Sequence, residues 1–588
     1  MSVRRLRILL GTGIIARPLA VVVSLLVAAL SQGQTGPVIN AVAGAADNWS
    51  ATDFGLARGS LFTIYGTNLA PSVASASALP LLTSLAGVTV TVSTNNQFMD
   101  APLLYVSPSQ INAILPSTAT EGSGWVTVEL NGALSNPASI WVRTSRFAPF
   151  TRSQLGYGPA VLQQYDRSGV WLNGLMHPAA PGQAVVLWGT GLGPLPSGSD
   201  ADAPGIVDLG SNVAILVGGS AAKPFYAGRS PQYPGLDQIN FYVPSTVPAG
   251  CYVPITVIVS GEAQFQVIIP RGSGSFDSRP TLSVGIPDSP CASEFGFSSQ
   301  LLERLDQGGT VRIAALSFES QTGSQSHGGL GQTATAWLGD YDEAHLSLLA
   351  TGWQSGPLAP AGFCERQAYS GPFTPQVSAA AGLIGQGVYG APSNDATLSL
   401  KIQGADGCSW NAQAYSPGSI SAESPYPDNC IASSYGLSGS AGSGGLFSVS
   451  GPLPAPRSWS PGDQLMVTSQ SGGSLQATWS LADSRPDDRL AVNLSSFEDT
   501  GSIPILPTGY TQNSLTCNVS PAGNSFLVQP DDAQWAWLML NQAASIQAGQ
   551  VSLNALQGPA SGLVSPAPPG APDVVLLLIR NQLSAFSP

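Results

Sequence analysis

Few residues of this chain have the type and spacing that catalysis requires. Only three histidines are present, at 177, 327 and 345, although histidine is the commonest general base in enzymes. A triad of Ser326, His345 and Asp342 is conceivable, because the carboxylates just before His345 could orient its imidazole. The loop that carries Ser326 lacks the Gly-x-Ser-x-Gly turn that presents the nucleophile of many serine hydrolases. The spacing therefore favours no serine hydrolase.

Carboxylates occur in two clusters that could have a chemical role. Asp340, Asp342 and Glu343 could supply the two acids that glycoside cleavage needs, or they could form a solvated loop. Asp200, Asp202 and Asp208 lie in a loop between expected strands and could offer oxygen ligands to a calcium ion. That loop is not an EF-hand, because the third acidic position and the terminal Glu of that motif are missing. No other cofactor is expected.

Aromatic residues offer a means of binding without catalysis. Trp535 and Trp537 are two positions apart, and side chains two apart on a strand share a face. Such a pair could stack on sugar rings, or it could fill the core, since tryptophan buries a large apolar area. Trp125, Trp171 and Trp188 lie within or beside expected strands, and we expect them in the core.

An internal repeat determines the elements that would position these residues. The string GSLFTIYGTNLAP at 59–71 returns as GQAVVLWGTGLGP at 182–194, and QINAILPS at 110–117 returns as QINFYVPS at 238–245. Two matched strings in the same order predict a module of roughly 120 residues that occurs twice. The second copy has an expected insertion at 227–235.

The predicted fold class is all-β. Short apolar runs bounded by Gly, Pro, Asn or Ser predict antiparallel strands, and about seven such strands in about 110 residues are typical of an immunoglobulin-like sandwich. A Ser/Gly/Ala-rich stretch at 433–445 predicts a flexible loop. The expected organisation is a signal peptide at 1–33, module 1 at 36–145, module 2 at 146–272, a linker at 273–294, a β-rich domain at 295–455 and a C-terminal sandwich-like domain at 456–588.

Both modules resemble the early-immunoglobulin type called IPT or TIG. More specifically, the strings at 101–112, 235–244 and 515–526 are similar to those of a large group of uncharacterised exported proteins of acidobacterial type. In that group an aromatic residue usually precedes Gln-Ile-Asn, whereas this chain has Asp237. The resemblance implies export and tandem β-sandwiches, but it implies no activity.

The composition narrows the range of partners. Only 9% of the residues are charged, against roughly 25% in an average soluble domain, and the net charge is -13. With Lys223 and Lys401 as its only lysines, the chain has no basic surface for nucleic acid. Hydrogen bonding and stacking remain available for recognition.

The N-terminus predicts export. Arg4, Arg5 and Arg7 precede a twelve-residue apolar run at 19–30, which is typical of a signal peptide and is too short for a comfortable membrane span of about 20 residues. No later segment is expected to cross a membrane. Six cysteines in an exported chain predict disulfides, and we favour a Cys251–Cys291 pair that closes module 2 against the segment that leaves it.

These observations predict a secreted or cell-surface protein with a non-catalytic binding, adhesion or surface-structural role. Its ligand would be an extracellular glycan or protein that the sequence does not identify. The alternative is a secreted polysaccharide-degrading hydrolase in which the immunoglobulin-like modules are accessory.

Overall fold

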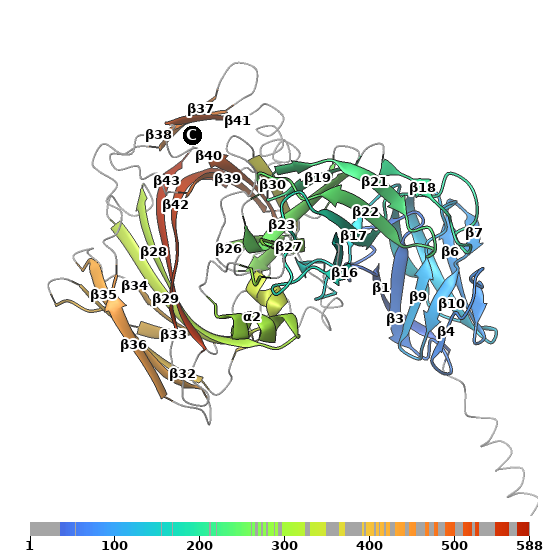
Figure 1. Cartoon of the computed structure of the whole chain (residues 1–588), viewed down its shortest axis with the longest axis horizontal. Helices are drawn as coiled ribbons and strands as arrows, with labels where there is room; N and C mark the ends of the chain where they lie inside the picture. The colour runs from blue at the N-terminus through green and yellow to red at the C-terminus, as the bar shows by residue number, and fades with distance from the viewer. Residues whose placement is uncertain are drawn as a thin grey trace, which may run out of the picture.

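The regular structure of the described residues is mainly β-strand, which confirms the predicted all-β class (Figure 1). The computed structural model describes residues 36–586 except for 53, 155, 167–168, 211–212, 219, 248, 260–261, 265–267, 272–273, 278–279, 287–288, 292–296, 324–329, 348–363, 371–390, 393–395, 405–406, 411, 417–418, 424–429, 442–445, 454–464, 470–474, 480–488, 500–509, 520–523, 529–546 and 564–572. The predicted signal peptide, Ser326, His327, Trp535 and Trp537 lie outside the described residues. Within the described part, no helix is long and apolar enough to cross a membrane.

Module 1 is a sandwich of two sheets. The first sheet has the order β1 (Val38–Gly44), β3 (Leu61–Thr67), β9 (Gln110–Ile114), β8 (Leu103–Val106), β4 (Ala74–Ser75). The second has the order β2 (Leu56–Ala57), β12 (Ala138–Arg143), β10 (Gly122–Leu130), β6 (Val88–Thr94), β5 (Ser84–Leu85), with β7 (Gln97–Asp100) on β6 and β11 (Ala133–Leu134) on β10. Alternate valines of β6, at 88, 90 and 92, are fully buried between the sheets.

Module 2 repeats this arrangement. Its first sheet has the order β16 (Gly169–Leu172), β15 (Leu162–Asp166), β17 (Ala184–Thr190), β22 (Asp237–Tyr242), β21 (Pro224–Arg229), β18 (Val207–Asp208), with β13 (Ala148–Pro149) on β17. Its second sheet has the order β14 (Gly158–Pro159), β27 (Pro280–Val284), β23 (Gly250–Val259), β19 (Val213–Val217), β20 (Ser220–Ala222), with β24 (Glu262–Gln264) on β23. β25 (Ile268–Arg271) and β26 (Gly274–Asp277) form a separate hairpin.

The second module extends further than the sequence predicted. β27 lies in the expected linker 273–294, yet it pairs with β23 and its residues are buried. The linker prediction is therefore wrong for 280–284. The Ser/Gly-rich composition of 272–277 suggested a spacer, whereas the strand that completes the sandwich follows directly after it.

The two repeated strings pair with each other in the same register in both modules. Tyr65 lies opposite Gln110 in module 1, and Trp188 lies opposite Gln238 in module 2. The internal repeat is therefore also a structural repeat. Each pair of strings forms the two central strands of the first sheet.

The predicted insertion joins the modules. In module 2, residues 230–236 connect β21 to β22. The equivalent connection in module 1, between β8 and β9, has only three residues, 107–109. Gly235 in this loop has a φ of +73°, and a Cβ atom there would lie 2.9 Å from Leu61 Cδ2 and 3.1 Å from Ile114 Cγ1. Thr190 Oγ1 accepts a hydrogen bond from the Leu61 N–H at 2.9 Å and donates to the Gly235 carbonyl at 2.6 Å. The inserted loop thus packs against the end of module 1.

A buried arginine completes this junction. Arg229, 1% exposed, donates to the carbonyl oxygens of Gly59 in module 1 at 3.0 Å and Gly193 in module 2 at 2.8 Å. Its guanidinium lies 2.9 Å from a carboxylate oxygen of Asp237, which is fully buried. One cation therefore connects both modules at the base of the inserted loop.

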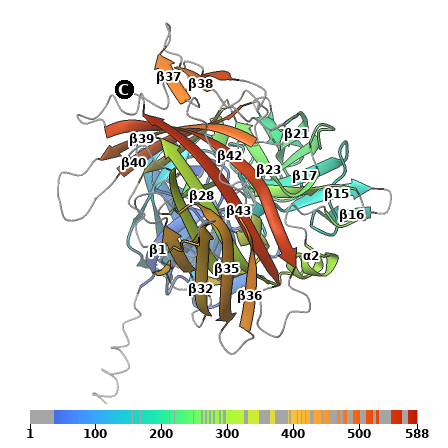
Figure 2. The same cartoon turned by 90° about the vertical axis from the view of Figure 1, so that its left-hand side faces the viewer.

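The C-terminal half is built around one large sheet. Its order is β30 (Cys364–Ser370), β40 (Tyr510–Val519), β39 (Arg489–Asp499), β42 (Gln547–Leu563), β43 (Val574–Phe586), β28 (Val311–Gly323), β29 (Leu330–Tyr341), β34 (Ser419–Glu423), β33 (Ala412–Ser416), with β31 (Ala391–Pro392) on β29 (Figure 2). β28 and β43 pair in parallel along most of their length. The sheet therefore crosses the expected boundary at 455/456, and the two expected domains share it.

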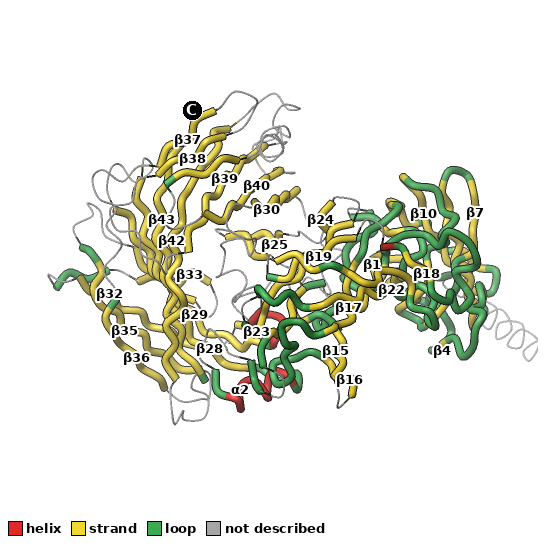
Figure 3. Tube along the Cα trace, turned by 45° about the horizontal axis from the view of Figure 1, so that its top comes forward, coloured by secondary structure: helices red, strands yellow, loops and turns green. Residues whose placement is uncertain are grey.

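Smaller sheets accompany this large sheet (Figure 3). They are β32 (Ala396–Gly404), β35 (Ala432–Ala441), β36 (Leu446–Pro452), and β37 (Leu465–Ser469), β38 (Leu475–Trp479), β41 (Ser525–Val528). The flexible loop predicted at 433–445 is wrong for 433–441, which belong to β35. β35 is a central strand because β32 and β36 pair with it on both sides, and its Leu437 is fully buried against β28 and β29 residues.

A short helix, α2 (Ser299–Asp306), lies where module 2 meets the large sheet. Ser298 caps the helix, and Leu301, Leu302 and Leu305 pack in one cluster with Val311 of β28 and the Cys251–Cys291 region of module 2. The cluster ties the C-terminal half to module 2.

The predicted Cys251–Cys291 disulfide is confirmed, with a Cα–Cα distance of 5.3 Å. A second disulfide joins Cys408 and Cys430 at a Cα–Cα distance of 5.8 Å. Both bonds lie in buried clusters.

We expect a third disulfide between Cys364 and Cys517. The β30–β40 register places these two residues directly opposite each other. Opposed residues of an antiparallel pair have Cα atoms about 4.5 to 5.5 Å apart, within the span that a disulfide bridges. Mass mapping of nonreduced peptides from secreted protein should recover three linked pairs, and a free thiol at either position would contradict this expectation.

Candidate functional site

The outer face of the first sheet of module 2 carries the strongest candidate site. Along β17, Val185 and Leu187 point into the core, so Ala184, Val186 and Trp188 point outward. β22 alternates in the same way, with Ile239 and Phe241 inside and Gln238, Asn240 and Tyr242 outside. Two central strands thus present an aromatic residue and amides on one face.

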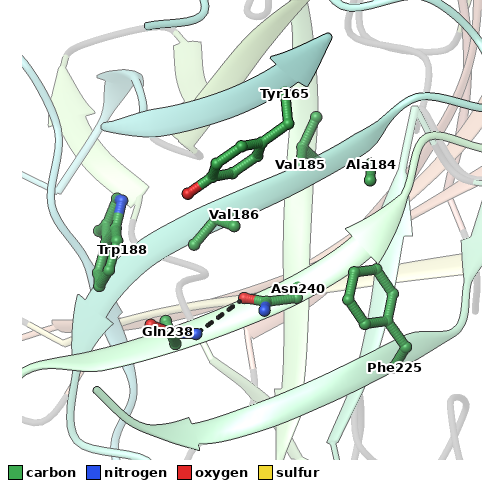
Figure 4. Close-up of a pocket in the computed structure, with 8 residues that line it drawn as sticks. All are labelled: Tyr165, Ala184, Val185, Val186, Trp188, Phe225, Gln238 and Asn240. Carbon is green, nitrogen blue, oxygen red and sulfur yellow. Dashed lines mark hydrogen bonds between the residues drawn. The ribbon is translucent and has the colours of Figure 1, made fainter. Parts of the chain in front are cut away.

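A groove of about 250 Å³ follows this face between the flanking strands β15 and β21 (Figure 4). Its lining residues are Tyr165, Ala184, Val185, Val186, Trp188, Phe225, Gln238 and Asn240. Figure 4 shows Tyr165 and Trp188 on one side of the two amides and Phe225 on the other. The lining contains no charged side chain, so an uncharged ligand would fit it without desolvating an ion.

The two amides supply directional polar groups at the floor of the groove. Gln238 Nε2 donates to Asn240 Oδ1 at 3.4 Å, a long hydrogen bond. Among the described residues, Gln238 Oε1 and Asn240 Nδ2 have no protein partner, which leaves one acceptor and one donor group for a ligand.

Exposed aromatic rings form the rim. Phe225 and Tyr242 have ring centroids 5.0 Å apart and are 54% and 56% exposed. Tyr165, on the opposite strand, is 46% exposed. Large aromatic surface in contact with water is costly, and several such rings around one groove indicate a binding surface.

The equivalent face of module 1 differs from this face at one end. Gln110 Nε2 donates to Asn112 Oδ1 at 2.9 Å, so the amide pair recurs there. The position equivalent to Tyr242 is Ile114, which is fully buried because Gly235 of the inserted loop packs on it. At the equivalent end of module 2, a Cβ atom on Gly182 would meet nothing within 4 Å among the described residues. The end of this string is thus covered at Ile114 in module 1 and exposed at Tyr242 in module 2.

Tryptophans that we expected in the core line surfaces instead. Trp125 and Trp171 are 40% and 38% exposed, so the prediction is wrong for both. Trp188 is half-buried and lines the groove. Trp171 stacks on His177 with centroids 5.2 Å apart, so this histidine supports an aromatic surface. All three tryptophans lie on outward positions of their strands, and strand position alone does not distinguish the two faces.

The acidic cluster of the hydrolase hypothesis is distributed among separate contacts. Asp340 receives two hydrogen bonds from the Arg312 guanidinium, both at 2.7 Å. Asp342 Oδ1 accepts from the backbone N–H of His345 at 2.8 Å and contacts its Nδ1 at 2.7 Å. Asp342 precedes a helical segment at 343–347, so it acts as a helix cap. Its backbone and imidazole contacts give it a structural role.

Glu343 has the most perturbed environment in the cluster. Its side chain is 8% exposed, and one oxygen lies 2.8 Å from Arg152 Nη1. The same Nη1 atom donates to Asp306 at 2.8 Å. Burial raises the pKa of Glu343 to about 7, although the Arg152 charge opposes this shift. The carboxyl is therefore held at the junction of module 2, α2 and the large sheet.

Two of the three aspartates expected as calcium ligands make separate contacts with the protein. Asp200 accepts from the backbone N–H and hydroxyl of Ser117 in module 1, both at 2.6 Å, so it contributes to the module junction. Asp208 accepts from the Gly210 N–H at 2.8 Å. Within the described part of the chain, no three His, Cys, Asp or Glu side chains lie close enough to hold a metal ion. Asp200, Asp202 and Asp208 therefore do not form the predicted ligand set.

The sequence contained a signal for the groove that the prediction missed. Trp188 and the Gln238-Ile-Asn240 segment belong to the two repeated strings, and their pairing places them on one face. The strings predicted the module, but they do not indicate that the inserted loop covers Ile114 in module 1 and leaves Tyr242 exposed in module 2.

No family model and no curated protein matches this chain. Solved structures similar to it include a tetra-tandem repeat from the extending region of a large adhesion protein, with 12% identity, 94% of this chain and 99% of that chain covered, and a TM-score of 0.12. A second is the FN1–FN3 domains of chicken CNTN1, with 9% identity, 72% of this chain and 99% of that chain covered, and a TM-score of 0.15. A third is SGBP-B of Bacteroides ovatus in complex with a mixed-linkage heptasaccharide, with 12% identity, 86% of this chain and 95% of that chain covered, and a TM-score of 0.12. Such low TM-scores carry no functional argument, so the groove must be interpreted from its own residues.

Proposed function

We propose that this is an exported, non-catalytic binding protein that holds a neutral glycan chain in the groove of module 2. The observation that carries the proposal is the groove itself, in which aromatic rings flank two amides with a free acceptor and a free donor. A sugar ring presents apolar C–H faces and an equatorial set of hydroxyls. Stacking on Trp188 or Phe225 and hydrogen bonding to Gln238 and Asn240 would satisfy both kinds of surface.

The size of the groove supports a short segment of a polymer as the ligand. Its volume of about 250 Å³ lies just below the range of about 300 to 1,000 Å³ that is typical of sites for drug-sized molecules. The groove would therefore take one or two sugar units, and the chain would continue past the exposed rim at Tyr242.

Export belongs to the same proposal. Two disulfides in buried positions favour an oxidising compartment, which agrees with the signal-like N-terminus. The low charge of the chain suits recognition by stacking and hydrogen bonds. Membership of the acidobacterial-type group with IPT/TIG-like modules is part of this proposal and rests on the shared sequence strings.

Removal of either ring from the groove should weaken binding to soluble glycans. In affinity electrophoresis through gels that contain soluble neutral polysaccharides, we expect the wild-type mature chain to be retarded. Trp188→Ala and Phe225→Ala should each weaken binding about ten-fold, since an aromatic contact contributes about 0.5 to 1.5 kcal/mol beyond its buried area. Tyr233→Ala is the matched control, because Tyr233 is 59% exposed and does not line the groove.

The same samples distinguish binding from cleavage. Release of reducing sugar by the wild-type chain would contradict a non-catalytic role and would favour the hydrolase alternative, with Asp340, Asp342 and Glu343 as the first residues to replace. Unchanged retardation of both ring variants would reject the groove as the site.

A further inference from the structure

Module 1 has a second aromatic surface, on the outer face of its second sheet. Phe98 on β7, Trp125 on β10 and Trp141 on β12 are 70%, 40% and 46% exposed. The neighbours of these residues along their strands, including Val126, Ile140 and Val142, are buried in the module core. The three rings therefore share the outward face. Figure 1 shows β6, β7 and β10 at the end of the molecule farthest from β28 and β43.

The strand register places these rings in a row. Phe98 lies opposite Ser93 of β6, Ser93 lies opposite Trp125, and Trp125 lies opposite Ser139 of β12. Trp141 is two residues beyond Ser139, so it is the diagonal neighbour of Trp125. We call Phe98, Trp125 and Trp141, with the serines between them, the aromatic strip.

The strand register sets the spacing of the rings within the aromatic strip. Neighbouring strands are about 4.7 to 4.9 Å apart, so Phe98 and Trp125, two strands apart, stand about 9 to 10 Å from each other along the sheet. Diagonal neighbours such as Trp125 and Trp141 are about 7 to 8 Å apart. Rings at such intervals can stack on successive or alternate units of an extended chain, whereas one compact ligand would contact only one or two of them.

Polar groups within the strip are hydroxyls. Ser123 and Ser139 flank the tryptophans, and no charged residue lies in the rows that hold the rings. Ser93 is 1% exposed, and its Oγ atom has no hydrogen-bond partner among the described residues. A buried hydroxyl without a partner is costly, and here it lies on the outer face between Phe98 and Trp125.

We propose that the aromatic strip of module 1 binds the flat face of an extended, neutral, insoluble polysaccharide. A flat sheet face with rings in line matches a surface of aligned sugar rings, and the absence of charge in these rows matches a ligand without charge. The strip is a second site, separate from the groove of module 2, and it does not depend on the groove.

The test measures depletion of the full mature chain from solution by microcrystalline cellulose and by chitin. We expect the wild-type chain to be depleted by at least one of them. Trp125→Ala with Trp141→Ala should lower the partition coefficient at least ten-fold, and Trp125→Tyr with Trp141→Tyr should restore much of it, because the rings are kept. Leu134→Ala is the matched control, since Leu134 is 65% exposed on β11 of the same sheet but lies outside the strip.

The groove variants separate this proposal from the previous one. Trp188→Ala with Phe225→Ala should leave depletion by the insoluble polysaccharide within about two-fold if the strip binds independently, and loss of depletion in that variant would overturn the strip. Equal depletion of wild type and the alanine pair in the strip would also overturn it. A wild-type chain that binds neither cellulose nor chitin would overturn the proposal as well. If that chain also self-associates in sedimentation through Trp125 and Trp141, the strip is instead a contact between copies.

Discussion

Replacement of Asp237 by asparagine is expected to lower the free energy of unfolding by about 3 to 5 kcal/mol, the cost of leaving a buried charge without its partner. The change is nearly isosteric, but it leaves the Arg229 guanidinium, 1% exposed, without a counter-ion. Asp237 also accepts from the backbone N–H groups of Gly191 at 2.6 Å and Leu192 at 2.8 Å. Burial raises the pKa of Asp237, while Arg229 and these two N–H groups oppose that rise. Arg229 and the two N–H groups therefore stabilise the charged form of Asp237 in its buried position.

The loss of stability in Asp237→Asn should be concentrated at the junction of the two modules, because Arg229 is hydrogen-bonded to both of them. Hydrogen exchange of the full mature chain should show faster exchange in peptides that cover Gly59 and residues 189–195, where the arginine and the aspartate are anchored. Asp202→Asn is the control, since it makes the same change at an exposed position of module 2 and should alter stability by no more than about 0.5 kcal/mol. Wild-type exchange in Asp237→Asn would show that the ion pair does not hold the junction.

Asp237 illustrates what the sequence could and could not predict. The sequence shows that an aspartate replaces the usual aromatic residue before Gln-Ile-Asn. Its ion-pair partner Arg229, however, lies on the other side of the inserted loop. A single sequence contains no indication that the two side chains meet in a closed space. The insertion itself was predicted, and the structure assigns it a purpose: the loop covers Ile114 of module 1 and brings Arg229 to Gly59.

Local patterns predicted elements well where one face of a strand is buried. The alternating valines of β6 and the apolar strings of β3 and β17 form strands in both modules as expected. β35 was missed because its Ser, Gly and Ala residues have little strand propensity, and the two flanking strands decide its conformation. The exposed tryptophans were misplaced for a related reason: strand periodicity shows that Trp125 and Val126 face opposite ways, but not which of them faces water.

The buried network around Glu343 makes the junction of module 2 and the C-terminal half sensitive to pH. The charged groups that face the Glu343 carboxyl are Arg152 from module 2, Asp306 at the end of α2, and Asp342. Tyr252 from β23 and Tyr157 lie nearby, and burial raises the pKa of both further above 10, outside the range of interest. One carboxyl oxygen of Glu343 has no hydrogen-bond partner among the described residues, which favours its protonated form.

We therefore expect the junction to become more stable as pH falls. The pKa of Glu343 is about 7 in the folded chain and near 4.5 when unfolded, so the folded state binds more protons between these values. The stabilisation is fully present below about pH 4.5, and it is lost as pH rises through about 7. Since one pKa unit corresponds to about 1.4 kcal/mol, the full effect is on the order of 3 kcal/mol.

Glu343→Gln should remove this pH dependence, because the amide cannot ionise, and it should stabilise the junction relative to wild type at pH 8. Calorimetric unfolding of the full mature chain from pH 4.5 to 8, with hydrogen exchange of peptides that cover α2 and β23, would measure the difference. Glu303→Gln removes an exposed carboxyl from α2 and should leave the wild-type profile unchanged. A wild-type profile that is flat across this range, or one that Glu343→Gln leaves unaltered, would assign the junction's pH response to other groups. A protein with this profile would keep module 2 and its large sheet most firmly docked in acidic surroundings.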